Sequence, residues 1–219
     1  MRILGRVLVA VIVIAALYLV LDFSGRIWAE SYVAGQVQRS LQLSGSPDVT
    51  FGGALFLPEL VSGKLSSARV KATDFTANGV RFTGVTLDLH DVRFSPGKLL
   101  FHEDSTIVAG SGQGTASMTD QQVTDAFQAQ GVPVTVHFTT DGNVRVGASR
   151  FPVAVQVNTA IHNGKLVLRP TAFNGISFTL DLPQVVRGMT YRSISFSGNI
   201  GVLTFGLRHA AFPVAPSAK

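Results

Sequence analysis

The chain of 219 residues contains no cysteine. This absence excludes a disulfide framework, a cysteine-ligated metal site and a thiol nucleophile. It does not identify the compartment, because a chain of this length can bury a sufficient core without disulfides. We therefore expect the fold to depend on its hydrophobic core alone.

Charged residues are also scarce: they make up 14% of the chain, whereas apolar residues make up 46%. The formal net charge is +5, and without Arg2, Arg6, Asp22 and Arg26 the remaining 15 basic and 12 acidic residues give +3. So small and scattered an excess does not indicate a nucleic-acid-binding protein. It suits either weak attraction to an anionic membrane surface or an ordinary, slightly basic domain.

Recognisable catalytic and metal-binding motifs are missing as well. The five histidines do not occur at metal-ligand spacing. The cluster His102-Glu103-Asp104 could not hold a metal ion by itself in a strand, because Glu103 would point away from its two neighbours. Neither a G-x-S-x-G nor a G-x-x-x-x-G-K-[ST] motif is present. "GSGQG" at 110–114 is interpreted as a glycine-rich strand, because no basic residue or helix start follows it directly. We expect no enzymatic activity, no metal and no cofactor.

One apolar run stands at the N-terminus, where residues 1–26 form a membrane anchor or a signal segment. Val7 to Leu21 is uncharged and would span about 22 Å as a helix, less than the roughly 30 Å of a hydrocarbon core. We favour the anchor, because "IWA" before Glu30 has the bulky Ile27 where a cleavage site of the A-x-A type has a small residue. Both interpretations export the rest of the chain, to the extracytoplasmic face of the plasma membrane or, after cleavage, to the cell envelope.

The body is expected to span residues 27–212, followed by a loose tail over 213–219. Ala29, Val33, Val37 and Leu41 recur every four residues and predict a helix that ends before Gly45 and Pro47. Two shorter helices are predicted. One lies within "FLPELVSGKL", from about Pro58 to Gly63, and the other begins at a capping box formed by Thr119 and Gln122 and stops at Gly131.

The remaining body indicates β-strands. Alternating apolar residues flank the turn signals Asp141-Gly142 and Asn163-Gly164, which is typical of hairpins. Val167 alternates out of phase with its two leucine neighbours, so it is expected on an outward face.

The stretch "GVRFTGVTLDLHDVRF" at 79–94 changes its pattern twice. Its apolar residues occupy even positions, then odd positions, then even positions again, with the changes at Gly84 and at His90-Asp91. A β-bulge would produce such a change and would bend the strand. We therefore predict an α+β, mainly β fold. It comprises a strongly curved antiparallel sheet of long strands with one N-terminal and one or two short helices, preceded by a single hydrophobic helix.

A curved sheet with few helices has a concave face that must be filled, and a lipid acyl chain can fill it. We expect acyl chains to contact apolar residues of the "FLPELVSG" element and of the strand at 80–94, namely Phe56, Leu57, Leu60, Val61, Phe82, Leu87 and Leu89. Lys64, Arg69 and Lys71 follow this element and would suit an anionic head group. They would equally suit the exposed face of an edge strand, where cations discourage pairing with other chains.

Three segments carry a resemblance to a known family: "AESYVAGQVQRSLQL", "VTFGGALFLPELVSGKLSSARVKATDF" and "GVRFTGVTLDLHDVRFSP". With the preceding hydrophobic segment, their order resembles the LmeA-like phospholipid-binding family of actinobacterial cell envelopes over residues 28 to about 208. The resemblance implies a tubular lipid-binding fold, an envelope location, anionic phospholipid ligands such as phosphatidylinositol species, and a role in lipoglycan elongation.

Three hypotheses are open from the sequence. The protein is a non-enzymatic, membrane-associated phospholipid-binding protein, or an envelope scaffold whose sheet is filled by its own side chains. The third is a glycan-processing enzyme that uses Asp88 and Asp91 as a carboxylate pair, although nothing distinguishes these two from exposed positions on a curved strand. We favour the first, with phospholipid and the plasma membrane as partners.

Overall fold

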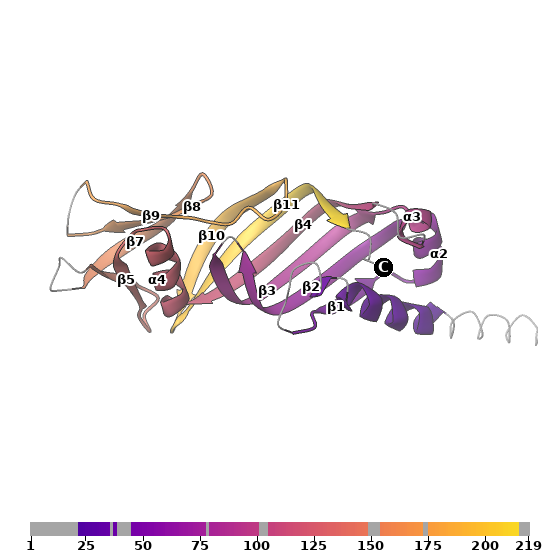
Figure 1. The fold of residues 1–219 in the computed structure, drawn as a ribbon, viewed down its shortest axis with the longest axis horizontal. Coiled ribbons are helices and arrows are strands. Elements are labelled where there is room, and N and C mark those ends of the chain that lie inside the picture. Colours follow the sequence, from indigo (N-terminus) through magenta and orange to yellow (C-terminus); the bar gives the residue numbers. More distant parts are fainter. Residues whose placement is uncertain are drawn as a thin grey trace, which may run out of the picture.

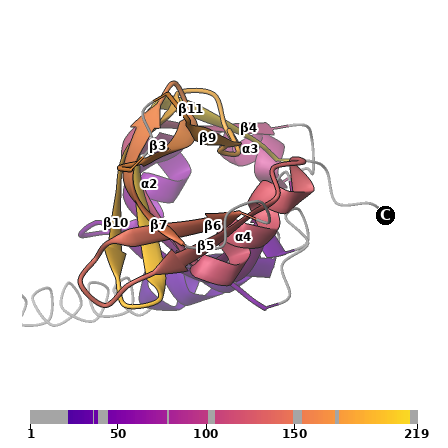
Figure 2. The ribbon, with the colours of Figure 1, turned by 90° about the vertical axis from the view of Figure 1, so that its left-hand side faces the viewer.

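The computed structural model describes residues 22–35, 37–38, 45–77, 79–100, 105–148, 154–172 and 175–214. These residues form an elongated body of two antiparallel β-sheets with short helices near both ends (Figure 1). Viewed along the long axis, the strands curl into a ring-like arrangement (Figure 2). The predicted curved, antiparallel and mainly β architecture is confirmed, although the strands are divided between two sheets.

The six-stranded sheet contains the longest strands. Its spatial order is β1 (Asp48–Gly52), β2 (Lys64–Ala77), β3 (Val80–Arg93), β4 (Ser105–Thr119), β11 (Ile200–Val214) and β10 (Met189–Ser197). The five-stranded sheet follows chain order: β5 (Val134–Phe138), β6 (Val144–Ala148), β7 (Val155–His162), β8 (Lys165–Pro170) and β9 (Phe178–Asp181). Both predicted hairpin turns are confirmed, because Gly142 joins β5 to β6, and Asn163 and Gly164 join β7 to β8, all with positive φ.

Three helices of the described residues lie where capping and periodicity predict them, and one further short helix was not predicted. Residues 22–35 and 37–38 are helical, so this first helix begins before the predicted Ala29; its predicted continuation to Leu41 lies outside the described residues. The short helix α2 (Phe56–Ser62) ends at Gly63, whose φ of 69° is left-handed. A further short helix, α3 (Pro96–Leu100), follows β3.

Helix α4 (Asp120–Ala129) begins at the predicted capping box, with both hydrogen bonds between Thr119 and Gln122 present. It also connects the two edge strands of the five-stranded sheet. On β5, Thr124 Oγ1 accepts the Val136 N–H at 2.8 Å and donates to the Val136 carbonyl. On β9, the Gln130 side chain accepts the Asp181 N–H at 3.0 Å and donates to its carbonyl. One side chain of α4 and that of its C-cap residue Gln130 thus occupy edge positions that another strand would otherwise use.

The two predicted face changes in 79–94 are confirmed, but not their mechanism. Phe82, Leu89 and Val92 are all buried, although these positions do not keep one parity. A β-bulge would shift the register of β2 against β3, whereas the register is the same along the whole pair. Instead, one residue on each strand leaves the ladder at the same level, with Asp74 and Asp91 in left-handed conformation.

The break at Asp91 continues across four strands. Ser66, Asp91, Gly110 and His209 lie at one level of β2, β3, β4 and β11, and none of them takes part in the ladder. Asp91 and His209 have φ values of 53° and 47°. Because all four strands change faces together, the sheet keeps an apolar inner face on both sides of this four-strand break.

Two expectations about position need correction. Val167 is buried rather than outward-exposed, although it is not part of the main core cluster. It lies between Ala160 of β7 and Thr179 of β9, because β8 has a neighbour on each side. Strand β11 continues through Val214, so regular structure extends two residues into the expected tail.

Residues 1–21 of the predicted hydrophobic segment lie outside the described residues. The cluster at 102–104 also lies outside them. In the part of the chain that the structure describes, no helix combines the length and apolar character needed to cross a membrane.

Candidate functional site

The two faces of the six-stranded sheet differ sharply in polarity. One row of aligned residues on the outer face reads Lys71, Thr86, Thr115, Thr204 and Ser193. The adjacent row on the inner face reads Ala72, Val85, Ala116, Leu203 and Ile194. Because strand side chains alternate, this pattern gives the curled sheet a polar exterior and an apolar interior.

Part of the inner face is not sealed. Along β3, Phe82 and Leu89 are buried, whereas Val85 and Leu87 between them are only half-buried. The same partial exposure occurs at aligned positions on β2 and β10. We define the inner apolar patch as Val70, Ala72, Val85, Leu87, Tyr191 and Ile194. These side chains form an apolar surface that is partly accessible to solvent.

Small residues form the centre of this face. Gly112, Gly114 and Ala116 occupy successive inner positions of β4, which lies between β3 and β11. The "GSGQG" segment is therefore a glycine-rich strand, as predicted. Its lack of side chains leaves depth on the concave face, where the Phe205 ring lies against Gly114.

Tyr191 supplies the one hydroxyl group of the inner apolar patch. Its hydroxyl donates to the Pro183 carbonyl at 2.7 Å, so the phenol oxygen is partnered. Burial raises the pKa of Tyr191 well above its ordinary value, because ionisation would place a charge in an apolar environment. The residue therefore remains neutral at physiological pH.

The predicted acyl-contacting residues are distributed over two regions. Leu87 lies in the inner apolar patch, and Leu89 and Phe82 lie on the same face but are buried. Phe56 is fully buried in the core, where it stacks on Phe51 with ring centroids 5.6 Å apart. The three remaining residues lie on α2: Leu57 and Leu60 are half-buried, and Val61 is exposed.

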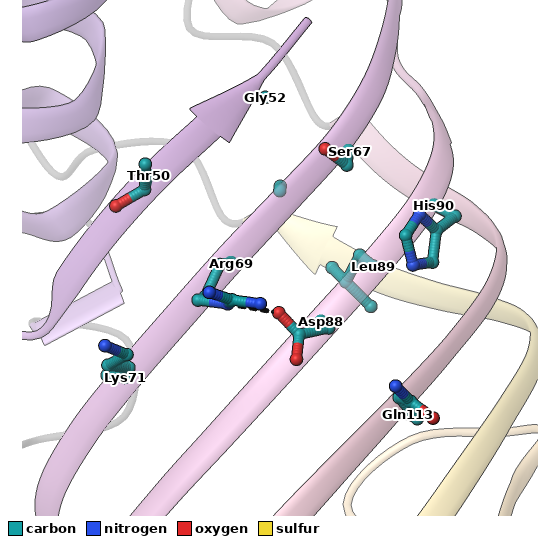
Figure 3. A pocket seen from close by; sticks show the side chains of 10 residues that line it. Thr50, Gly52, Ser67, Arg69, Lys71, Asp88, Leu89, His90 and Gln113 are labelled. Atoms are coloured by element: carbon teal, nitrogen blue, oxygen red, sulfur yellow. Dashed lines mark hydrogen bonds and ion pairs between the residues drawn. The ribbon is translucent and has the colours of Figure 1, made fainter.

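The predicted cations lie on the outer face. Arg69 and Lys71 line a shallow groove on β2 together with Asp88, His90 and Gln113 (Figure 3). Arg69 forms an ion pair with Asp88, and this hydrogen bond raises the pKa of the guanidinium further. Strand β2 is not an edge strand, since β1 covers it. The structure thus separates these cations from the inner apolar patch by the thickness of the sheet.

The carboxylate pair considered from the sequence has little support from its surroundings. Asp88 is engaged by Arg69, and Asp91 is an exposed residue of the four-strand break. Among the described residues, no group of three or more His, Asp or Glu side chains could hold a metal ion.

A functional arrangement that the sequence interpretation missed involves the charged residues of the first helix. Asp22 accepts hydrogen bonds from the N–H groups of Phe56 (3.0 Å) and Leu57 (2.6 Å). It thereby caps α2, whose own N-cap residue Leu55 supplies no side-chain bond. These hydrogen bonds, with Leu57 contributing most, lower the pKa of Asp22. The signal for this cap in the sequence was Asp22 itself, a lone acidic residue directly after the apolar run Val7–Leu21.

Comparison with known proteins supports the resemblance noted in the sequence. Residues 20–217 match the family described as LmeA-like phospholipid-binding. No curated protein and no solved structure gives a significant match. The match includes every residue that the structure describes, and therefore both sheets and all the described helices. The chain belongs to the LmeA-like phospholipid-binding family.

Proposed function

We propose that the protein is a non-enzymatic phospholipid-binding protein of the extracytoplasmic cell envelope, which holds acyl chains against the inner apolar patch. The observation that carries this proposal is the half-buried patch on the apolar inner face, which on β3 lies between buried Phe82 and Leu89. A closed core would leave these side chains no solvent exposure. A lipid tail would cover them and would need few specific contacts.

The energetics suit reversible binding. Transfer of methylene groups from water gains about 0.8 kcal/mol each, but a lipid that leaves a bilayer starts from an apolar medium. The net gain from the patch is therefore small, and lipid can both enter and leave. This balance favours a carrier or a lipid-presenting protein, which would support the assembly of envelope lipids or lipoglycans. The N-terminal apolar run supports placement at the plasma membrane, and the preference for anionic lipids is part of the proposal.

Native mass spectrometry of the purified full chain, followed by lipid extraction, tests this function. We expect phospholipid to remain bound through purification in detergent and to be displaced by added phospholipid. The variant Leu87→Glu should lose it, and Thr86→Glu, a matched change on the outer face of the same strand, should retain it. Protein that carries no lipid in any detergent, and takes up none from vesicles, would contradict the proposal.

A second candidate function, an envelope scaffold with a self-filled sheet, is favoured by one observation. Leu203, Phe205 and Leu207 already fill the inner face of β11 and are buried. In that case the lipid-free protein would show the same stability as protein incubated with phospholipid. A ligand that binds the folded state raises the unfolding temperature, so thermal unfolding with and without lipid separates the two functions.

A further inference from the structure

The first helix has an inverted arrangement of charge. Its three charged residues, Asp22, Arg26 and Glu30, all contact the body of the protein. Arg26 Nη2 donates to the Gly53 carbonyl at 2.9 Å, and Glu30 Oε1 accepts the Phe51 N–H at 2.7 Å. With the bonds from Asp22 to α2, these contacts fix the helix firmly against β1 and α2.

The exposed side of this helix carries no charge, and apart from Ser24 and Ser31 its side chains are large and apolar. Phe23 and Trp28 are each 66% exposed, and Ile27 and Tyr32 are exposed as well. The Trp28 and Tyr32 rings stack with centroids 5.6 Å apart. A helix on the surface of a soluble domain normally directs its charges to water and its apolar residues to the core. This helix packs Ala29 and Ala34 on the core, but it also directs its charges inward and its large apolar side chains to water, which indicates that its outer face meets something other than water.

More exposed apolar side chains occur at the same end of the molecule. Helix α2, which Asp22 ties to the start of the first helix, presents Val61 at 79% exposure, and Leu55 precedes it (Figure 1). Of the nine large apolar side chains exposed in the described part of the chain, six belong to this end. Such a concentration is typical of an interaction surface.

Cations border this apolar surface. Lys64 and Arg93 lie directly opposite each other on β2 and β3, at the strand ends next to α2 and α3, and Lys98 belongs to α3. All three are exposed, and none forms an ion pair within the described residues. Like charges directly opposite each other destabilise a strand pair, so an external anion would relieve this repulsion.

We propose that this end of the molecule docks on the surface of a phospholipid bilayer, with Phe23, Ile27, Trp28 and Tyr32 in the interfacial region and Val61 beside them. A bilayer is favoured over a protein partner for two reasons. The uncharged run Val7–Leu21 ends at the residue before Asp22, so the apolar face continues a membrane-suited sequence. Trp and Tyr prefer the head-group level, where Lys64, Arg93 and Lys98 would meet lipid phosphates. The docking surface is distinct from the inner apolar patch and does not require that the patch bind lipid.

Trp28 is the only tryptophan of the chain, so its fluorescence reports this surface directly. The full-length protein is reconstituted into nanodiscs of phosphatidylcholine and phosphatidylglycerol. We expect a blue-shifted emission, quenching by phospholipids brominated on their acyl chains, and protection from aqueous acrylamide. The control carries Trp28→Phe with Thr140→Trp, which moves the reporter to an exposed turn of the five-stranded sheet. It should be quenched by acrylamide and not by brominated lipid.

Two variants make the result specific. Phe23→Ser with Ile27→Ser should reduce quenching of Trp28 by brominated lipid, and circular dichroism should show an unchanged fold because both side chains are exposed. Leu87→Glu, which is expected to empty the inner patch, should leave this quenching unchanged, so failure of lipid storage and failure of docking can be told apart. Free access of acrylamide to Trp28 would overturn the proposal. A second result would also overturn it: in nanodiscs that hold two copies of the protein, Trp28 is protected from acrylamide but is not quenched by brominated lipid. In that case a second chain, and not the bilayer, would cover this face.

Discussion

The ring of Phe205 on β11 lies directly against the backbone of Gly114 on β4. A Cβ added at Gly114 would stand 2.6 Å from the Phe205 Cε2 atom and 2.7 Å from the Thr86 carbonyl oxygen. Real Cβ atoms do not approach other atoms so closely, and neither the buried ring nor the strand backbone can yield easily. The absence of a Cβ at Gly114 is therefore required for the Phe205 ring to lie so close to β4 on the inner face.

Gly114→Ala should lower the free energy of unfolding by about 1–3 kcal/mol, the usual cost of overpacking. Thermal unfolding of the purified protein measures the effect. Gly97→Ala in α3 is the control, because nothing lies within 4 Å of an added Cβ there. Equal stability of the two variants would show that the ring moves aside without cost.

The hydrogen bonds that Asp22 accepts at α2 predict a pH-dependent stability. The folded protein holds the pKa of Asp22 below its ordinary value, so its contribution is fully present above about pH 4, the unfolded pKa. It is lost as the pH falls through the lower, folded pKa. Asp22→Asn should therefore be less stable than the wild type at neutral pH, and the difference should narrow below pH 4.

Denaturation of the full chain in detergent across this pH range provides the measurement. Asp48→Asn gives the baseline, since Asp48 is an exposed residue of β1 with no side-chain hydrogen bond among the described residues. A stability difference between Asp22→Asn and the wild type that is constant with pH would contradict the assignment.

Lipid retention should respond to charge on one face of β3 only. Leu87→Glu places a carboxylate in the inner apolar patch, and a buried, unpaired charge costs several kcal/mol unless water enters. Thr86→Glu places the same group on the outer face, next to Lys71 across the ladder. Bound phospholipid, quantified by mass spectrometry after extraction, should fall for the first variant alone. If both variants retain the same amount of phospholipid and are equally stable, the inner face of β3 is not the lipid-binding face.

The outer groove on β2 should contribute little to the choice of lipid. Arg69 is already paired with Asp88, and Lys71 points away from the inner apolar patch. Arg69→Gln with Lys71→Gln should leave the preference between anionic and zwitterionic phospholipids unchanged across a salt series. A selective loss of anionic lipid, with a flatter salt dependence, would instead return the head group to this groove.

Thr124 is expected to stabilise the contact between α4 and β5, an edge strand of the five-stranded sheet. Thr124→Val keeps the shape of the side chain but leaves the Val136 N–H and carbonyl groups without their partner, at a cost of roughly 1–3 kcal/mol for each buried group. Thr124→Ser retains the hydroxyl and should remain close to the wild type. Unfolding by urea compares the two, and similar midpoints would mean that water replaces the hydroxyl.

Local signals in the sequence were sufficient for much of the fold. The capping box at Thr119, the turn at Asn163-Gly164 and the stop at Gly63 each depend on neighbouring residues, and all three are present. The face changes near Gly84 and Asp91 were also visible, because the apolar residues change parity there. Their mechanism was not, since a matched break on the partner strand depends on pairing that no single segment contains.

The candidate site was less predictable for the same reason. Tyr191 and Ile194 join Leu87 on one face only through β4 and β11, which lie between β3 and β10. Phe56 carries the right chemistry for an acyl chain, but its stacking on Phe51 makes it part of the core. Val167 alternates as an outward residue should, and its cross-strand neighbours bury it. Sequence periodicity identifies a face, whereas burial depends on what packs there.

The pairing of β4 with β11 has a consequence for how the chain is made. Thr119 pairs with Ile200 and Ser105 with Val214, so the larger sheet joins a strand from the centre of the sequence to one about 80 to 110 residues further along the chain. Contacts between residues so far apart in the sequence form slowly, because the entropy of closing a long loop is lost before any hydrogen bond between the strands forms. During synthesis, which starts at the N-terminus, β4 is completed long before β11. Until then the edge of β4 is unpaired and can pair with another molecule. Among the described residues, this final strand of 15 residues is also the one strand to which β10 is hydrogen-bonded. The synthesis of β11 therefore covers the open edge of β4 and allows β10 to join the sheet.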